Sequence, residues 1–470
     1  MEKPLPIIGA FARNKAIVKM AVPVFLELIL SVAMGYVTQF LLTPIPLASN
    51  GVSQANQIAN IFLVSFSVLS SSSLILLCQL VGKGDDESAK KIYPLSLYLN
   101  LLIGVIVALA VFGFSFFVFS WMGVKENVIP FAKAFLALTA PSFVFQALTN
   151  VFSSFLRANK RMVPPTAIAF ISNAVNAIVG AIFIFGIPGL TEMEKLYGVA
   201  ISTDLSRLVA LIASYVFYKK TVGASLSIKL LRPFPGSILR RLLGIGLPTA
   251  GETLSYQASQ LVLAVIINLS VGVLEQNLRN YLITFTSIIY LFAQGTGVAM
   301  QVVEGQLLGK GDKEGAERLV QDVGTMARTV SALLSILLLC LSYPIFQALL
   351  APAQSSAESN PTGISLHAIG IMALLCMVID VFLDQGRATN LVYVKGLETS
   401  GDILFPVSCS MVTSWVCTVG VSALLCLVFK LGVYGAFIGA ALDEIIRAIM
   451  FYVRWKRGKW KRRSITEGLS

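Results

Sequence analysis

The chain has 470 residues and a net charge of +12 at neutral pH, yet only 13% of its residues are charged and 56% are hydrophobic. A soluble globular domain carries about 25% charged residues, so this composition excludes soluble classes of protein and indicates an all-α polytopic membrane protein. The basic residues lie beside apolar runs rather than on a soluble module. We therefore expect membrane lipids, and no nucleic acid, as partners.

Twelve apolar runs are long enough to cross a bilayer as helices. In chain order they cover residues 16–42, 54–80, 92–122, 128–156, 166–188, 195–218, 242–270, 280–308, 320–351, 363–394, 404–430 and 432–455. The last boundary is the least defined, because residues 430–432 leave almost no loop between two runs.

The distribution of lysine and arginine predicts the orientation of these spans. If the N-terminus is cytoplasmic, the inner segments hold 29 Lys and Arg residues, whereas the outer loops hold four. Cytoplasmic loops of membrane proteins carry an excess of basic residues. We therefore predict a multi-pass protein of the cell membrane with both termini in the cytoplasm. Short loops and the lack of an evident signal peptide favour a bacterial or archaeal inner membrane.

The chain contains an internal duplication. Residues 79–92 (QLVGKGDDESAKKI) and 306–319 (QLLGKGDKEGAERL) are identical at eight of 14 positions and lie about half a chain length apart. Their glycines suit tight turns, and Asp85 or Asp312 could cap the following helix. Other landmarks recur in the same order: Pro23 with Glu27, Pro248 with Glu252, and Tyr-Gly at 197–198 and 434–435.

Each half holds an even number of spans, so the repeat is parallel and the halves share an orientation. We expect a six-helix lobe at 1–218, a cytoplasmic linker at 219–241, a second six-helix lobe at 242–455 and a basic tail at 456–470. Pro233, Pro235 and Gly236 interrupt any helix in the linker.

Motifs of common enzymes are missing from the sequence. It contains no G-x-x-x-x-G-K-[ST], H-E-x-x-H, C-x-x-C or G-x-S-x-G motif. The single histidine, His367, excludes a His-based metal cage, and all six cysteines fall inside apolar runs, so no disulfide framework is expected. A duplicated helical bundle with these properties is predicted to be a carrier, not an enzyme, and to need no cofactor.

Carboxylates within the spans are the main candidates for function, because an ionised carboxylate at the bilayer centre costs at least about 2.5–3.5 kcal/mol. Asp384 lies eleven residues before Lys395, or about 16 Å along a helix, and therefore near the midplane. Asp380 lies one turn further out on the same face. We interpret this pair as an ion or proton site; the alternative is that Arg387 pairs with Asp384 and nothing titrates.

Glu252 lies at a similar depth. With Tyr256 and Gln260 it forms a polar stripe at i, i+4 and i+8, flanked by Gln257, which indicates a face turned to the bundle interior or a cavity. Further candidates for a substrate cavity lie in the first half: Glu27, which is the repeat mate of Glu252, Thr38, Gln39, Asn173 and Asn176. For the two asparagines, hydrogen bonding between helices is an equal alternative.

Four other acids of the spans, Asp204, Glu304, Asp443 and Glu444, lie near predicted cytoplasmic boundaries. Arg207 follows Asp204 by three residues and Arg447 follows Asp443 by four. Local ion pairs along the helix therefore explain Asp204 and Asp443 without a functional role.

Eight segments in order resemble the multidrug and toxic compound extrusion (MATE) transporters. They are MAVPVFLELILSVAMGYVTQFLL, QLVGKGDDESAKKI, LTNVFSSFLRANKRMVPP, ISNAVNAIVGAIFIFG with LYGVAIS, LLGIGLPTAGETLS, QLLGKGDKEGAERL, VKGLETSGDILFP and LGVYGAFIGAALDEIIR. The resemblance implies a monomeric carrier of twelve helices in two bundles around a central cavity. It further implies that Na⁺ or H⁺ entry drives export of organic, often cationic and amphipathic, small molecules by alternating access.

The family's charged positions are only partly present. Thr38 and Gly180 occupy the two positions where members with an N-lobe ion site have aspartates, and Tyr256 occupies that of a span-seven glutamate. Asp384 matches the family's span-ten acid. The resemblance therefore favours coupling through Asp384, with Asp380 and Glu252.

Three other interpretations stay open at this level. One is a flippase for a lipid-linked or polyanionic substrate from the same superfamily, although such a cavity should hold several deep Lys or Arg residues. Another is an intramembrane enzyme or receptor-like module, against which the missing motifs and the duplication argue. The third is a family member that has lost transport.

Overall fold

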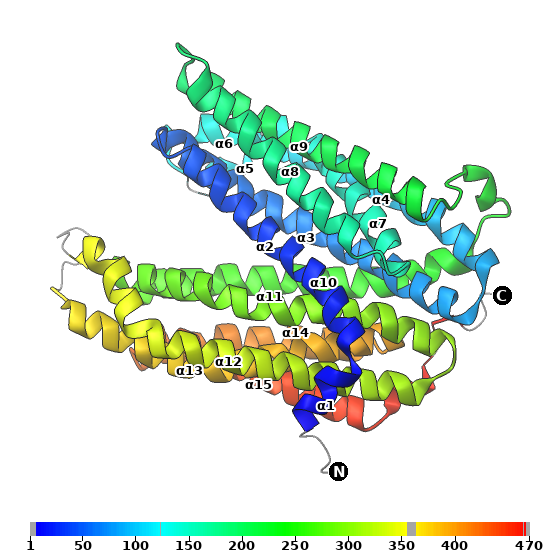
Figure 1. Ribbon diagram of the computed structural model, residues 1–470. Coiled ribbons are helices and arrows are strands. Elements are labelled where there is room, and N and C mark those ends of the chain that lie inside the picture. Colours follow the sequence, from blue (N-terminus) through cyan, green and yellow to red (C-terminus); the bar gives the residue numbers. More distant parts are fainter. Residues whose placement is uncertain (1–5, 123, 355–362, 464, 467–470) are drawn as a thin grey trace. The chain divides into compact units, whose positions relative to one another are not determined.

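The computed structural model is all-helical over the residues that it describes, 6–122, 124–354, 363–463 and 465–466, which confirms the predicted fold class (Figure 1). The side chains at 6–8, 36, 39, 64, 65, 67, 68, 352 and 353 are not described.

Helices of the first half follow the predicted apolar runs. They are α1 (Pro6–Arg13), α2 (Lys15–Leu41), α3 (Pro46–Lys83), α4 (Asp86–Phe114), α5 (Val118–Trp121), α6 (Ile129–Thr139), α7 (Ser142–Ala158), α8 (Val163–Ala181) with a π-helical continuation η1 (Ile182–Gly186), and α9 (Glu192–Thr221). The predicted run 128–156 is formed by α6 and α7, which meet at a bend of 49°.

Helices of the second half begin after a linker that contains only the short 3₁₀ turn η2 (Ile228–Leu231). They are α10 (Gly236–Ser270), α11 (Val273–Gly309), α12 (Lys313–Gln354), α13 (Leu366–Ser400), α14 (Leu404–Thr413) with the π-helices η3 (Ser414–Val421) and η4 (Leu424–Val428), α15 (Gly432–Lys456) and the 3₁₀ turn η5 (Lys459–Arg462). Left-handed φ angles of 54° at Lys430 and 55° at Gly432 make the tight turn before α15. Every one of the twelve predicted runs thus contains a helix.

Hydropathy alone identifies fewer spans than the sequence predicted. Eight helices among the described residues are long and apolar enough to cross a membrane, or nine if the bent pair α6 and α7 is one span. The helices α10 and α15 are long but do not pass this test. The protein is therefore a multi-pass membrane protein by the length and composition of its helices.

The two copies of the repeated motif fold alike. Gly84 and Gly311 end their helices with left-handed φ angles of 76° and 80°, which glycine adopts without steric cost. The next residue caps the following helix: Asp85 accepts a hydrogen bond from the Ser88 backbone N–H at 3.0 Å, and Asp312 accepts one from Gly315 at 2.8 Å. The predicted turn and cap are confirmed in both copies.

Gly309 of the second copy packs against the helix end of the first copy, within the unit to which both belong. A Cβ atom added at Gly309 would lie 2.0 Å from the carbonyl oxygen of Gln79 and 2.8 Å from the backbone nitrogen of Lys83. Only glycine permits this backbone-to-backbone approach.

The chain forms two compact units. One contains residues 1–25, 251–308 and 312–465, and the other contains residues 26–250, 309–311 and 466–470. The boundary between the units falls within α2, after Phe25, and within α10, after Ala250, so each of these helices belongs in part to each unit. The lobe boundaries that we set from sequence, at residues 218 and 242, stay a prediction.

The unit that contains α11 to α15 also includes part of the predicted basic tail. Trp460 on η5 stacks on Trp455 at a ring separation of 4.2 Å and is only 1% exposed. The Lys461 ammonium pairs with Glu317 at 2.6 Å. Trp460 and Lys461 of the predicted tail thus pack against α15 and α12.

Candidate functional site

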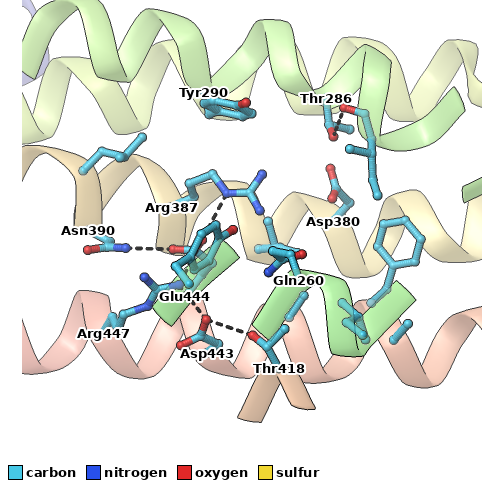
Figure 2. A pocket seen from close by; sticks show the side chains of 18 of the residues that line it. Gln260, Thr286, Tyr290, Asp380, Arg387, Asn390, Thr418, Asp443, Glu444 and Arg447 are labelled. Atoms are coloured by element: carbon cyan, nitrogen blue, oxygen red, sulfur yellow. Dashed lines mark hydrogen bonds and ion pairs between the residues drawn. The ribbon is translucent and has the colours of Figure 1, made fainter. Parts of the chain in front are cut away.

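A cavity of about 370 Å³ lies within the unit formed by α10 to α15 (Figure 2). Its polar lining comes from five helical segments: Glu252, Thr253, Tyr256 and Gln260 on α10; Arg279, Thr286, Tyr290 and Gln294 on α11; Asp380, Arg387 and Asn390 on α13; Thr418 on η3; and Asp443, Glu444 and Arg447 on α15. Four carboxylates and three guanidinium groups therefore share one cavity.

A close approach of two helices places the first ion pair. A Cβ atom at Gly386 would lie 2.9 Å from the backbone of Glu444, so α13 and α15 pack with their backbones in near contact there. The next residue, Arg387, reaches Glu444 with its Nε at 3.2 Å, and Asn390 Nδ2 donates to the other oxygen of Glu444 at 2.9 Å. Glu444 is therefore bound through both of its carboxylate oxygens.

The second ion pair lies one turn further along α15. Arg447 Nη2 pairs with Asp443 at 2.5 Å and with Glu444 at 3.3 Å. Thr418 donates to the same Asp443 oxygen at 2.9 Å from the π-helical η3, which α15 approaches closely at Gly439. A π-turn in this position brings a hydroxyl to a carboxylate inside the bundle.

Aromatic rings cover both arginines. The guanidinium carbon of Arg387 lies 5.2 Å from the ring centre of Tyr290, and that of Arg447 lies 5.7 Å from the ring centre of Tyr256. Such cation–π contacts stabilise a charge that is removed from water.

The carboxylates of Asp380 and Asp384 are held differently. Asp384, which is 1% exposed, accepts a hydrogen bond from Ser335 Oγ on α12 at 2.8 Å. One oxygen of each aspartate, Oδ2 of Asp380 and Oδ1 of Asp384, is buried without a hydrogen-bond partner among the described residues. Asp380 lines the cavity and Asp384 lies one helical turn behind it. The pair is thus a place where a proton or a cation would satisfy buried acceptors.

The sequence left open whether Arg387 pairs with Asp384. It pairs with Glu444 rather than with Asp384, so the interpretation in which Arg387 neutralises Asp384 directly is wrong. The reason is the near contact of α13 and α15 at Gly386, which brings Glu444 to Arg387 from a distant part of the chain.

Among the predicted site residues of α10, Glu252, Tyr256 and Gln260 line this cavity. Gln257, one residue past Tyr256, is half-buried and does not line it. The stripe expected at i, i+4 and i+8 is therefore present on one face of α10, and the flanking residue lies off that face.

The candidates of the first half lie in the other compact unit. Glu27 forms an ion pair with Arg157 at 2.6 Å. Asn173 donates to the Leu30 carbonyl at 2.7 Å, Asn176 donates to Thr203 at 3.3 Å, and Thr38 donates to the Met34 carbonyl at 3.1 Å. The side chain of Gln39 lies outside the described residues. The alternative of hydrogen bonding between helices thus holds for both asparagines, although Asn176 Oδ1 keeps no described partner.

At Gly180, a Cβ atom would lie 3.0 Å from the side chain of Leu41. An aspartate would not fit this contact without a shift of the neighbouring side chain.

Several residues that line the cavity were placed elsewhere by the sequence analysis. We counted Arg387 and Arg447 as cytoplasmic, and we placed Asp443 and Glu444 near the membrane boundary. The predicted local pair of Asp443 with Arg447 is confirmed, but these residues line the cavity. A usable signal was present in the sequence, because two acids and an arginine at i, i+3 and i+4 interrupt an otherwise apolar helix.

Asp204 and Glu304, two other acids of the spans, form no ion pair among the described residues, so the predicted local pair of Asp204 with Arg207 is not found. Arg207 donates to Ser142 Oγ at 2.8 Å and forms no ion pair with Asp204 among the described residues. Glu304 is 0% exposed, and neither of its carboxylate oxygens has a hydrogen-bond partner in the described part of the chain. No cluster of three His, Cys, Asp or Glu side chains that could hold a metal ion occurs among the described residues.

The chain is similar in sequence and in structure to known proteins. The MatE family model matches residues 15–182 and 248–424. The chain is 27% identical to "Uncharacterized transporter YisQ" of Bacillus subtilis over 93% of each chain. It is 24% identical to "Probable multidrug resistance protein NorM" of Thermotoga maritima over 96% of this chain and 94% of that one. A crystal structure of MATE in the bent conformation superposes with a TM-score of 0.79 at 17% identity and 95% coverage of both chains.

Proposed function

The chain belongs to the MatE family, and from this premise we propose that it is a multidrug exporter that moves organic, cationic or amphipathic compounds out of the cell in exchange for Na⁺ or H⁺. The observation that carries the proposal is the charged cavity of α10 to α15 together with the buried Asp380–Asp384 pair. Relatives named as multidrug resistance proteins support the substrate class. The protein acts as a carrier rather than as an enzyme.

The cavity suits a small organic cation by size and charge. Its volume of about 370 Å³ falls in the range of about 300–1,000 Å³ that is typical of small-molecule sites. The two ion pairs made by Arg387 and Arg447 neutralise Glu444 and Asp443. Glu252 and Asp380 also line the cavity, and neither forms an ion pair among the described residues. The faces of Tyr256 and Tyr290 add sites at which a cation is attracted.

Competition for the carboxylates provides the coupling. Each ionised carboxylate at this depth needs a counter-charge, because leaving it alone costs at least about 2.5–3.5 kcal/mol. An entering proton or Na⁺ at Asp384, Asp380 and Glu252 and an organic cation in the cavity supply the same counter-charge, so one displaces the other. Alternating access then moves the ion inward and the compound outward.

We further propose that both termini are cytoplasmic and that the protein is a monomer in a bacterial or archaeal cell membrane. Arg279, Arg387 and Arg447 line the cavity; without them, 27 basic residues in the inner segments against three in the outer loops still support this orientation.

The flippase alternative is less favoured for an electrostatic reason. Contrary to the sequence-based argument, three arginines do line the cavity, namely Arg279, Arg387 and Arg447. However, two of them are already paired with carboxylates, so the cavity offers little net positive charge to a polyanion.

The test uses the purified chain in liposomes. We expect a fluorescent organic cation such as rhodamine 123 to move against its gradient when an inward Na⁺ or pH gradient is imposed. An ionophore that dissipates the effective gradient should stop this movement, and comparison of the two gradients identifies the ion. Transport that stays at the level of protein-free liposomes under both gradients would contradict the proposal.

A further inference from the structure

The two halves of the chain hold a duplicated acid in different ways. Glu27 and Glu252 each follow the proline of their helix by four residues. Glu27 is bound by Arg157, whose Nη2 lies 2.6 Å from the carboxylate. Glu252 lines the cavity of α10 to α15 and forms no ion pair among the described residues. One acid of the duplicated pair is thus neutralised by a cation, and the other is not.

Hydrogen bonds at two helix ends show which residue of the second half corresponds to Arg157. Near the end of α7, the carbonyl of Arg157 accepts a hydrogen bond from the N–H of Lys160, which has a left-handed φ of 58°. Near the end of α13, the carbonyl of Glu398 accepts one from the N–H of Gly401, which has a left-handed φ of 88°. In both helices the next N–H bonds to the carbonyl of the residue before that acceptor. Glu398 therefore occupies in the second half the position that Arg157 occupies in the first.

The charge at this position is inverted, because an arginine in the first half corresponds to a glutamate in the second. The charges of Glu398 and Lys395 on α13 act on the carboxylate of Glu252. Arg447 on α15 and the Ser410 hydroxyl on α14 act on it as well. A like charge thus faces Glu252 at the position from which a cation neutralises its counterpart in the first half.

The cation on this part of α13 is Lys395, and Glu398 holds it. Lys395 lies one turn past Leu391, which lines the cavity, and on the same face of the helix. Its Nζ is 3.0 Å from Glu398 Oε2, and the side chain of Glu398 is only 5% exposed. The stem of Lys395 packs against α11, where a Cβ atom at Gly297 would lie 3.5 Å from its Cγ. The lysine is therefore bound to the acid three residues further along its own helix and not to Glu252.

We propose that Glu398 is a positioning residue for ion coupling, because its ion pair keeps the Lys395 ammonium away from Glu252 and leaves the Glu252 carboxylate open to the entering H⁺ or Na⁺. This inference rests on the proposed function, since it assumes that an ion enters at Glu252. A carboxylate that already has an ammonium partner has less affinity for a second cation. The inverted charge at one repeated position thus makes the acid of the second half, and not that of the first, the one that binds the coupling ion.

A purely structural role for Glu398 makes a different prediction. If Glu398 served only to stabilise the end of α13, removing Lys395 as well would not repair the loss of Glu398. If Glu398 holds Lys395 away from Glu252, removing the lysine restores the open carboxylate. A single and a double variant therefore separate the two roles.

The experiment measures export of rhodamine 123 by the full-length chain in liposomes at increasing concentrations of the driving ion. In Glu398→Gln the released ammonium pairs with Glu252 and competes with the ion. We expect the ion concentration for half-maximal export to rise by about tenfold or more, as for an opposite charge within about 4–6 Å of a carboxylate. The maximal rate at saturating ion should change little. The double variant Glu398→Gln with Lys395→Gln should restore the half-maximal concentration of the unmodified protein.

Two further variants complete the design. Glu398→Arg places in the second half the charge that Arg157 has in the first, and it should raise the half-maximal concentration more than Glu398→Gln does. Glu314→Gln is the matched control, because it removes an ion pair with Arg318 in which the side chains are 83% and 82% exposed. It should leave the half-maximal concentration unchanged.

An unchanged half-maximal concentration in Glu398→Gln would overturn the inference, as would a rise that the double variant does not reverse. If Glu398→Gln does not fold, Glu398→Asp, which lengthens the ion pair, replaces it in both comparisons. Export by the unmodified chain is scored first. Its failure under both gradients refutes the proposed function and the inference with it, whereas normal export that does not respond to the change at Glu398 refutes only the inference.

Discussion

Neutralising Asp384 is the most direct test of coupling through α13. Asp380 and Asp384 lie at i and i+4, where Cβ atoms are about 6 Å apart. With an effective dielectric constant of about 20, a monovalent cation held at Asp380 is attracted to the charge of Asp384 by about 3 kcal/mol. This energy corresponds to a factor of about one hundred in affinity, since 1.4 kcal/mol is a factor of ten. Asp384→Asn should therefore abolish gradient-driven export.

The fold should tolerate this substitution. The asparagine carbonyl oxygen can still accept the hydrogen bond that Ser335 Oγ donates at 2.8 Å. A buried charge with one unpartnered oxygen is removed, so the melting temperature should stay the same or rise. Export of rhodamine 123 from liposomes and thermal unfolding of the same preparation measure the two effects. Glu314→Gln, at a side chain that is 83% exposed, is the control. Undiminished ion-coupled export by Asp384→Asn would refute the assignment.

Three substitutions outside the cavity test contacts within the units, and the effect of each on stability is measured by reversible unfolding in mixed micelles. Gly309→Ala should destabilise the protein by about 3 kcal/mol, because its Cβ would lie 2.0 Å from the Gln79 carbonyl oxygen; unchanged stability would show that this contact relaxes freely. Arg157→Gln should cost about 2–3 kcal/mol by leaving Glu27 without its cation, and adding Glu27→Gln should recover part of the loss. Trp460→Ala should cost about 3–4 kcal/mol, since a buried stacked ring is removed; a neutral effect would mean that the tail does not stabilise its unit.

Much of the local structure could be predicted from sequence. The turn and cap in both copies of the repeated motif follow from glycine and aspartate at set positions, and they need no information from elsewhere in the chain. The polar stripe of α10 could be predicted for the same reason, because helical periodicity alone puts Glu252, Tyr256 and Gln260 on one face.

Pairing between helices could not be predicted in this way. Arg387 and Glu444 are separated by 57 residues, and their contact depends on the close approach of α13 to α15 at Gly386. A rotation of either helix by one residue, about 100°, would turn these side chains away from each other. Sequence reasoning considered only neighbours on the same helix, and it therefore offered Asp384 as the partner of Arg387.

The sequence by itself determined that this chain crosses the membrane many times as a duplicated helical bundle, and it singled out Asp380, Asp384 and Glu252 as acids at depth. Composition and periodicity are enough for this, because apolar length and helical spacing are properties of each segment alone. Only the tertiary structure decided which charges neutralise one another and which stay unpaired in the cavity. That decision depends on helix packing, where a single glycine contact sets which side chains from distant segments come within hydrogen-bond distance.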